Sequence, residues 1–307
     1  MSTHTMSFER LSNDFRVDYY LGKFENTDRE IVKNYNLTLK TISKFINEWP
    51  SSVPMNAKEY IKSFTSLITE CKYRDKNFYV IPGDNFVKQD VYGLSKTRTH
   101  DDTKTTILRR LNIQRHWEHY YNKPADIPFD MKRNVLFWRG TTTSHLKRLA
   151  NRFTCVTKWW NKHPKIDVGF SFLSQNKNLG AKFVKGKVSI QQMLRHKYIL
   201  SIEGNDKDSG LNWKLNSNSL VFMAKPTCVS WLMEDQLVPN YHYILVEDEF
   251  GDLGERYEWC EQNPDQCKKI IKNANDFMKG FSDKKNEDLI EKKVLTIYIN
   301  NVNSNLG

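Results

Sequence analysis

Residues suited to binding phosphate follow a strand-like apolar run near the middle of the chain. The run 134–138 leads into a glycine and a cluster of hydroxyl groups, and a basic helix is predicted over 145–152. Backbone N–H groups, hydroxyls and a helix N-terminus bind anionic oxygens, and an arginine can add a bidentate pair of hydrogen bonds. A threonine-capped helix with a basic outer face explains the same residues equally well. The candidate residues here are Arg139, Gly140, Thr141, Thr142, Lys147 and Arg148.

A second polar turn follows the strand-like run 197–202 and precedes a short helix predicted at 211–216. In parallel sheets, ligands bind beyond the carboxyl ends of the strands, where loops lead into helices. The glycine, asparagine and serine residues of this turn allow backbone N–H groups to point toward an anion. An ordinary polar turn between a strand and a helix has the same composition. The turn contains the candidates Asn205, Asp206, Lys207, Ser209 and Gly210.

A candidate catalytic carboxylate lies in the first third of the chain. Asp84 follows the apolar run 78–81, within a turn that begins with Pro82 and Gly83. Loops at the ends of strands often carry catalytic residues. Aspartate also builds such turns or caps the following segment. The residues alone leave both interpretations open.

The elements that must position these residues are those of an α/β protein. Short apolar runs alternate with helical patterns, which is typical of a parallel sheet with crossover helices. Strands are predicted at 78–81, 134–138, 197–202, 219–223 and 242–246. Helices are predicted at 28–49, 56–71, 105–121, 145–152, 211–216 and 264–279, and from 287 onward.

A chain of 307 residues is longer than a single core usually grows, so we expect two domains. Pro124 and Pro128 lie in a polar stretch that suits a linker. The predicted division is an N-terminal domain at 1–128, a second domain at 129–285 and a closing segment at 286–307.

Composition excludes several classes of protein. No apolar run reaches the ~18 residues of a membrane span, and the first twenty residues lack a secretory pattern. The five scattered cysteines contain no C-x-x-C pair, which favours a cytoplasmic location over a disulfide framework. His116 and His119 lack a third ligand, so we expect no metal and interpret both as surface or packing residues.

The chain is basic, with a net charge of +11. The positive charge is spread through the chain and interleaved with 36 acidic residues. This pattern favours one basic cleft for a small phosphorylated ligand over a surface that binds nucleic acid.

Three groups of motifs resemble one known family, glycosyltransferase family 90. The first group is Trp138-Arg139-Gly140-Thr141-Thr142, which is similar to the W-R-G-S/T signature of that family. The second group is 197–206 with 211–213 and 218–219. The third group is 231–234 with Pro239, His242-Tyr243 and 257–259. The family includes capsule-associated and lipopolysaccharide-modifying enzymes and the animal protein O-glucosyl- and O-xylosyltransferases. The resemblance covers about 130–280 and points to the bacterial and large-virus branch.

The resemblance implies a glycosyltransferase B fold, in which two Rossmann-like domains face a cleft. It implies transfer of xylose or glucose from a UDP-sugar to a hydroxyl of a glycan, glycolipid or glycoprotein. The reaction would invert the sugar carbon in a single displacement, without an obligatory cofactor or metal and without nucleic acid. Two alternatives remain: a basic nucleic-acid-binding protein, and an inactive glycosyltransferase-like binding subunit.

The resemblance also assigns roles to residues. Thr141, with Lys147 or Arg148, is similar to the diphosphate contacts, and the segment with Asp167 and Val168 is similar to the loop that holds uracil. The turn from Asn205 to Gly210 matches the loop around the pyrophosphate. A family arginine falls on Gly210 here, so Lys207 or Lys214 is expected to neutralise phosphate instead. Asp84 is similar to the general base of the family, which favours its catalytic interpretation, and Lys96 and Thr97 are similar to residues that line the cleft.

Overall fold

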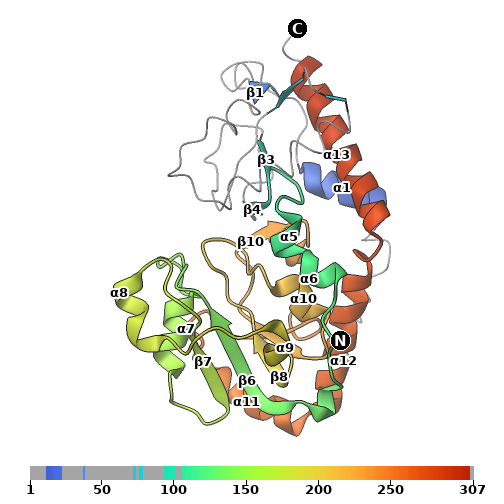
Figure 1. Cartoon of the computed structure of the whole chain (residues 1–307). Coiled ribbons are helices and arrows are strands. Elements are labelled where there is room, and N and C mark those ends of the chain that lie inside the picture. The colour runs from blue at the N-terminus through green and yellow to red at the C-terminus, as the bar shows by residue number, and fades with distance from the viewer. Residues whose placement is uncertain are drawn as a thin grey trace. The chain divides into compact units, whose positions relative to one another are not determined.

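The computed structural model describes residues 12–22, 37–38, 72–73, 76–78, 93–100 and 106–304. The chain divides into two compact units. The first draws on residues 1–113, 228–232 and 283–307, and the second on 114–227 and 233–282. The first unit is therefore assembled from segments that are far apart in the sequence (Figure 1), whereas the second is interrupted only by 228–232.

In its described part, the first unit combines two helices with three short pairs of strands. The helices are α1 (Asn13–Leu21) and α13 (Lys284–Ser304), and α13 confirms the helix predicted from 287 onward. The antiparallel pairs are β1 (Leu37–Thr38) with β2 (Asn77–Phe78), and β4 (Thr97–Thr99) with β10 (Cys228–Ser230). The parallel pair is β3 (Gly93–Ser95) with β5 (Thr106–Leu108).

A buried ion pair joins α1 to α13. Arg16 donates from Nη1 to Glu287 Oε1 at 2.5 Å and from Nη2 to Glu287 Oε2 at 2.7 Å. Trp231 Nε1 donates to the same carboxylate at 2.6 Å, and its ring stacks on Tyr20 at 3.7 Å between centroids. A charge buried in this way is stable only with its partner in place. Helix α13 is therefore an integral part of the first unit.

The second unit is built on a parallel sheet of five strands in the order β11-β9-β8-β6-β7. The strands are β6 (Arg133–Gly140), β7 (Ile166–Phe170), β8 (His196–Leu200), β9 (Leu220–Met223) and β11 (Ile244–Leu245). Four of them confirm predicted strands and the predicted parallel α/β class. The fifth, β7, lies where a loop was expected at Asp167 and Val168.

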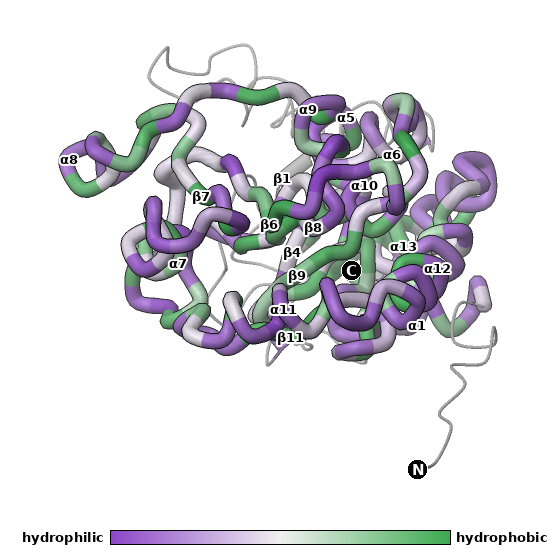
Figure 2. Tube along the Cα trace, turned by 90° about the horizontal axis from the view of Figure 1, so that it is seen from below, coloured by the Kyte–Doolittle hydropathy of each residue, from purple (hydrophilic) through white to green (hydrophobic). Residues whose placement is uncertain are grey.

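Successive side chains of each strand point to opposite faces of this sheet, and helices pack against both faces. Tyr198 and Leu200 belong to the main core cluster, which also contains residues of α7 (Arg152–Trp159) and α11 (Leu253–Gln262). Ile199 points the other way and packs with Trp213. That second cluster lies between the sheet and the short helices α9 (Ile190–Met193) and α10 (Leu211–Leu215). The apolar strands form the interior of the unit (Figure 2, green).

Shorter elements and one long helix complete the second unit. They are α5 (Ile113–His116), α6 (Glu118–Tyr121), η2 (Phe129–Met131), α8 (Lys177–Gly180), η3 (Ala181–Phe183), η4 (Glu234–Gln236) and α12 (Pro264–Lys279). Helix α12 confirms the helix predicted over 264–279, with Pro264 at its start. No helix in the described ranges is both long and apolar enough to cross a membrane.

Two of the predicted helices are wrong. Residues 145–150 form turns, and α7 begins only at Arg152, where the Asn151 side chain accepts hydrogen bonds from the N–H groups of Phe153 and Thr154. The segment 105–121 is interrupted because Asn112 has a left-handed φ of 56°, so that β5 and two one-turn helices replace one helix.

Several predictions fall outside the described residues. The helix at 56–71, most of the strand at 78–81, and Asp84 lie there. Most of the helix predicted at 28–49 also lies there, but its residues 37–38 are described and form strand β1, so the prediction is wrong at those two positions. The division into domains after residues 128 and 285 stays a prediction.

Candidate functional site

The topology of the second unit singles out one position at the edge of its sheet. From β6 the chain crosses to β7 on one side, and it later returns to β8 on the other side of β6. In open parallel sheets, ligands bind beyond the carboxyl ends of the strands where the direction of winding reverses. The segments that leave the sheet there are 139–144 and 201–210, which are the two polar segments identified in the sequence.

A cleft of about 330 Å³ opens at this position, which is large enough for a small-molecule ligand. All of its lining residues belong to the second unit. They are Arg115, His119, Trp138, Arg139, Gly140, Thr141, Arg152, Ser171, Ile190, Met193, Asp208, Ser209, Gly210, Trp213 and Lys214.

The lining combines cations with apolar side chains, and Arg152 Cζ and Lys214 Nζ each lie 5.8 Å from a ring centroid, of Trp138 and Trp213 respectively. Four cations face the cleft, and four apolar side chains accompany them. Ile190 and Met193 pack against Trp213, and the ring of Trp138 folds over Gly140. A Cβ atom on Gly140 would lie 2.5 Å from Trp138 Cζ2, so this position requires glycine. Such a lining suits a ligand with an anionic group next to ring systems.

Arg152 is held at the end of β6 by main-chain and hydroxyl oxygens. Its Nη1 donates to Thr143 Oγ1 at 2.7 Å and to the carbonyl oxygen of Thr141 at 3.2 Å. Its Nε and Nη2 atoms both lie 3.4 Å from the carbonyl oxygen of Ile202, which follows β8. The guanidinium therefore bridges the two segments that form the cleft.

Arg139 is fixed by a carboxylate on the neighbouring strand. Its Nη2 donates to both carboxylate oxygens of Asp167, at 2.8 and 2.9 Å, and its Nη1 to the main-chain oxygen of Asp167 at 3.0 Å. Burial opposes ionisation of Asp167, but hydrogen bonds from Arg139 and Lys185 outweigh it, so the pKa of Asp167 is lowered. Much of the charge of Arg139 is thus balanced within the protein.

Lys214 and Asp208 form the second ion pair of the cleft. Lys214 Nζ lies 2.5 Å from Asp208 Oδ2 and 3.0 Å from the carbonyl oxygen of Leu200. Burial opposes ionisation of Asp208, but Lys214 and a hydrogen bond from Ser201 lower its pKa. The N–H group of Gly210 donates to Asp208 Oδ1 at 2.9 Å, so this carboxylate also orders the turn before α10.

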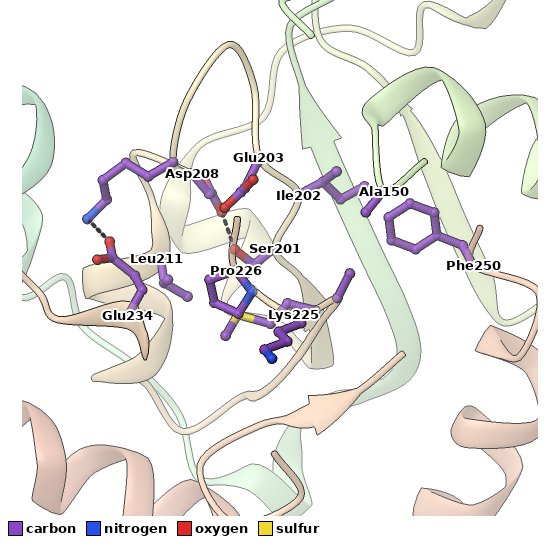
Figure 3. Close-up of a pocket in the computed structure, with 13 residues that line it drawn as sticks. Ala150, Ser201, Ile202, Glu203, Asp208, Leu211, Lys225, Pro226, Glu234 and Phe250 are labelled. Atoms are coloured by element: carbon purple, nitrogen blue, oxygen red, sulfur yellow. Dashed lines mark hydrogen bonds and ion pairs between the residues drawn. The ribbon is translucent and has the colours of Figure 1, made fainter. Parts of the chain in front are cut away.

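A much smaller cavity lies against the turn 203–210 and shares Asp208 with the cleft (Figure 3). Its volume of about 20 Å³ is enough for a water molecule and too small for a nucleotide. Lys207 lines it and donates to Glu234 at 2.7 Å. Glu203 also lines it and accepts from Arg148 at 3.1 Å, while burial raises the pKa of Glu203. Lys207 and Arg148 therefore lie outside the lining of the cleft, and their proposed roles in binding phosphate stay predictions.

The cleft brings together six of the residues proposed from the sequence. They are Arg139, Gly140, Thr141, Ser209, Gly210 and Lys214. The structure places the other candidates from the second unit outside the lining: Thr142, Lys147, Arg148, Asp167, Val168, Asn205, Asp206 and Lys207. Thr142 connects the segment after β6 to the segment after β7, since its Oγ1 accepts a hydrogen bond from the N–H of Ser174 at 2.8 Å.

The remaining candidates belong to the first unit or lie outside the described residues. Lys96 and Thr97 are buried in the first unit, next to and within β4. The position of Asp84 is outside the described residues. The roles of these three residues stay predictions.

Sequence reasoning missed several lining residues. Arg115 and His119 come from α5 and α6, whereas His116 between them is buried as a packing residue. The helix predicted over 145–152 ends at Arg152, whereas in the structure a helix begins there. Asn151 before it is a recognisable helix cap. Among the described residues, no group of three or more His, Cys, Asp or Glu side chains could hold a metal ion.

Comparison with known proteins matches this chain to one family of glycosyltransferases. A family model described as Glycosyl transferase family 90 matches residues 104–298, which is more than half of the chain. The O-glucosyltransferase LpsA of Dichelobacter nodosus is 32% identical over 182 residues, which are 59% of this chain and 53% of that protein. Protein O-glucosyltransferase 2 of Danio rerio is 25% identical over 146 residues, which are 46% of this chain and 28% of that protein.

A viral relative belongs to the same group of matches. The uncharacterized protein 035R of Invertebrate iridescent virus 3 is 28% identical over 127 residues, which are 41% of this chain and 11% of that protein. This chain thus spans about half the length of its bacterial relative and less of the other two. The matched region contains all the residues that line the cleft. The chain belongs to glycosyltransferase family 90.

Proposed function

We propose that this protein transfers a sugar from a UDP-sugar to a hydroxyl group of a glycan, glycolipid or glycoprotein. The observation that carries this proposal is the cleft at the reversal point of the sheet, whose lining combines four cations with aromatic and aliphatic side chains. A UDP-sugar carries groups that match both kinds of side chain, because a charged diphosphate joins two ring systems. Membership of family 90 supports sugar transfer as the reaction.

The diphosphate lies, in this proposal, between Arg152 and Lys214, with the hydroxyl of Thr141 as a further donor. These cations compensate for the family arginine that falls on Gly210 in this chain. Both are fixed by the contacts described above before any ligand binds. Donors fixed in this way stabilise charge that grows on the leaving group without reorganising during the reaction. No metal ion is needed in this scheme.

The chemical step is a single displacement. The carboxylate of Asp84 accepts the proton of the acceptor hydroxyl as its oxygen bonds to the anomeric carbon. The bond from that carbon to the UDP oxygen breaks on the opposite face, and the electron pair leaves with UDP. The configuration at the anomeric carbon is therefore inverted. Asp84 and the acceptor belong to the N-terminal half, as in a glycosyltransferase B arrangement.

Glucose is the donor sugar that the relatives favour, since two of them are named O-glucosyltransferases. Xylose differs from glucose by one hydroxymethyl group and is the alternative. Isothermal titration of the protein with UDP, UDP-glucose and UDP-xylose, with and without a chelator, tests the proposal. We expect binding of one UDP-sugar that does not depend on the chelator.

Failure to bind any of these nucleotides would reject the proposed donor. Loss of binding with the chelator would instead reject the metal-independent scheme. The configuration of the product, measured by NMR, would separate inversion from retention.

A further inference from the structure

The positive charge of this chain is concentrated in one segment. Residues 131–202 contain 15 lysine and arginine residues and a single acidic residue, Asp167, so their net charge is +14. The rest of the chain has a net charge of −3. This corrects the expectation that the charge is spread evenly. The segment forms the part of the second unit from η2 to β8.

The cleft uses only a small part of this charge. Of the 15 cations, Arg139 and Arg152 line the cleft, and the other 13 do not. A diphosphate carries too little charge to explain the surplus. Lys132, Arg148 and Lys158 pair with acidic residues outside the segment, and the remaining cations require a different explanation.

Four of them lie in the segment 172–187, which we call the α8 segment and which contains no acidic residue. Lys185 pairs with Asp167 at 2.7 Å. Lys177, Lys182 and Lys187 are exposed, and no carboxylate of the described residues forms an ion pair with them. The α8 segment therefore presents positive charge to the solvent.

The α8 segment also exposes large apolar side chains. Phe172, Leu179 and Val184 are 43%, 57% and 38% exposed. The ammonium group of Lys187 lies 4.8 Å from the ring centroid of Phe172. Figures 1 and 2 place α8 at the outer edge of the second unit, on the side of the edge strand β7. Exposed lysines and apolar groups are thus mixed along one peripheral segment.

The α8 segment is anchored to the rest of its unit. Phe183 is buried and packs edge-on against Trp160 at 5.4 Å between centroids. A Cβ atom on Gly180 would lie 2.5 Å from the methyl group of Thr142, so the backbone approaches closely there. Phe172 and Leu179 are therefore held outward by a packed segment.

We propose that the α8 segment docks this protein onto an anionic membrane surface. Negatively charged head groups attract lysines, and each lysine near such a surface strengthens binding roughly fivefold. Phenylalanine, leucine and valine side chains gain further by entering the interface between head groups and acyl chains. A nucleic acid would engage the lysines but would leave the aliphatic side chains in water. The apolar exposure therefore favours the membrane.

Cosedimentation of the full chain with vesicles tests this proposal. We expect binding to vesicles of phosphatidylcholine mixed with phosphatidylglycerol, weakening as salt is added, and no binding to phosphatidylcholine alone. Replacing Lys177, Lys182 and Lys187 by glutamine is expected to weaken binding on the order of a hundredfold. A matched variant changes the exposed lysines Lys269, Lys285 and Lys292 in the same way and should bind nearly as the wild type does.

The apolar contribution is tested separately. The variant Phe172→Ser with Leu179→Ser is expected to weaken vesicle binding at least tenfold. Its control, Met131→Ser with Leu289→Ser, removes apolar groups elsewhere that are even more exposed, at 71% and 65%, and should retain binding. Hydrogen exchange should slow in 172–187 when the mixed vesicles are added.

Two results would overturn the proposal. One is equal vesicle binding by the wild type and the Phe172→Ser, Leu179→Ser variant, because the contact would then be purely electrostatic. The other is binding of random oligonucleotides as tightly as of mixed vesicles, with loss only in the lysine variant. The second result would identify a nucleic-acid surface instead.

Discussion

Arg152 and Lys147 are alternative partners for the diphosphate, and they differ in their surroundings. Arg152 lines the cleft and is held by Thr141, Thr143 and Ile202, whereas Lys147 is exposed and outside the lining. We expect Arg152→Ala to weaken UDP binding ten- to a hundredfold, since hydrogen bonds to a charged group contribute about 1.5–3 kcal/mol. Lys147→Ala should change the affinity less than twofold. Titration calorimetry with UDP measures both, and the opposite order would favour the assignment made from the family resemblance.

Asp84 can be separated from donor binding by a conservative change. Asp84→Asn keeps the size of the side chain but removes the proton acceptor, so transfer should fall on the order of a hundred- to ten-thousand-fold. UDP affinity should stay within about twofold, because the proposed phosphate contacts belong to the second unit. Asp90→Asn, six residues further along, is the matched control. Near-normal turnover of Asp84→Asn would show that another group takes the proton.

The candidate site could be predicted only where its residues are neighbours in the sequence. Gly140 and Thr141 follow a strong apolar strand, and Ser209 and Gly210 lie in a turn between a strand and a helix. Arg115 and Trp213 carry no local signal of their role, because the cleft forms only when folding brings at least five separate segments together. The spacing of residues along the sequence does not show which distant residues meet in the folded cleft.

At the scale of elements, the sequence predicts strands correctly, but it mispredicts a helix where tertiary contacts override the local preference. The strands β6, β8 and β9 were predictable because their apolar runs are short, continuous and bounded by polar turns. The spacing of cations over 145–152 resembles a helix, but the N–H of His145 donates to Gly204 and Arg148 pairs with Glu203. These contacts stabilise turns in place of a helix.

The segment that leads into β11 should make the second unit sensitive to acid. Burial lowers the pKa of His242 to about 4, and its Nδ1 accepts a hydrogen bond from the N–H of Val238 at 2.8 Å. Between about pH 6.5 and 4 the unfolded chain binds a proton that the folded chain does not bind. The free energy of unfolding should therefore decrease by up to about 3 kcal/mol as the pH falls through that range.

The variant His242→Asn keeps an acceptor near Val238 but cannot titrate. Urea denaturation at several pH values should give a shallower pH dependence for this variant than for the wild type. Equal slopes would mean that His242 is protonated in the folded state or does not contribute.

At the scale of the whole molecule, the two units should respond separately to mutation. Glu287→Ala leaves Arg16 buried without its carboxylate, so unfolding of the first unit should become easier by about 3–5 kcal/mol. UDP affinity under native conditions should be unchanged, because no lining residue of the cleft belongs to the first unit. Chemical denaturation and calorimetry measure these two effects. A parallel loss of UDP binding would show that the units are coupled.

The same two helices provide a control for this comparison. Asp14 and Lys293 form an exposed ion pair between α1 and α13 at 2.8 Å. Solvent screens such a pair, so Asp14→Ala should leave the midpoint of denaturation nearly unchanged.

The path of the chain through the first unit has a consequence for its biosynthesis. Arg16 and Glu287 are separated by 271 positions, so a ribosome that adds about 5–20 residues per second makes them roughly 14–54 seconds apart. During that interval Arg16 lacks the carboxylate of Glu287, and both segments of the second unit, 114–227 and 233–282, are synthesised. The second unit can therefore fold first on the ribosome, and the first unit must wait for the last helix to emerge.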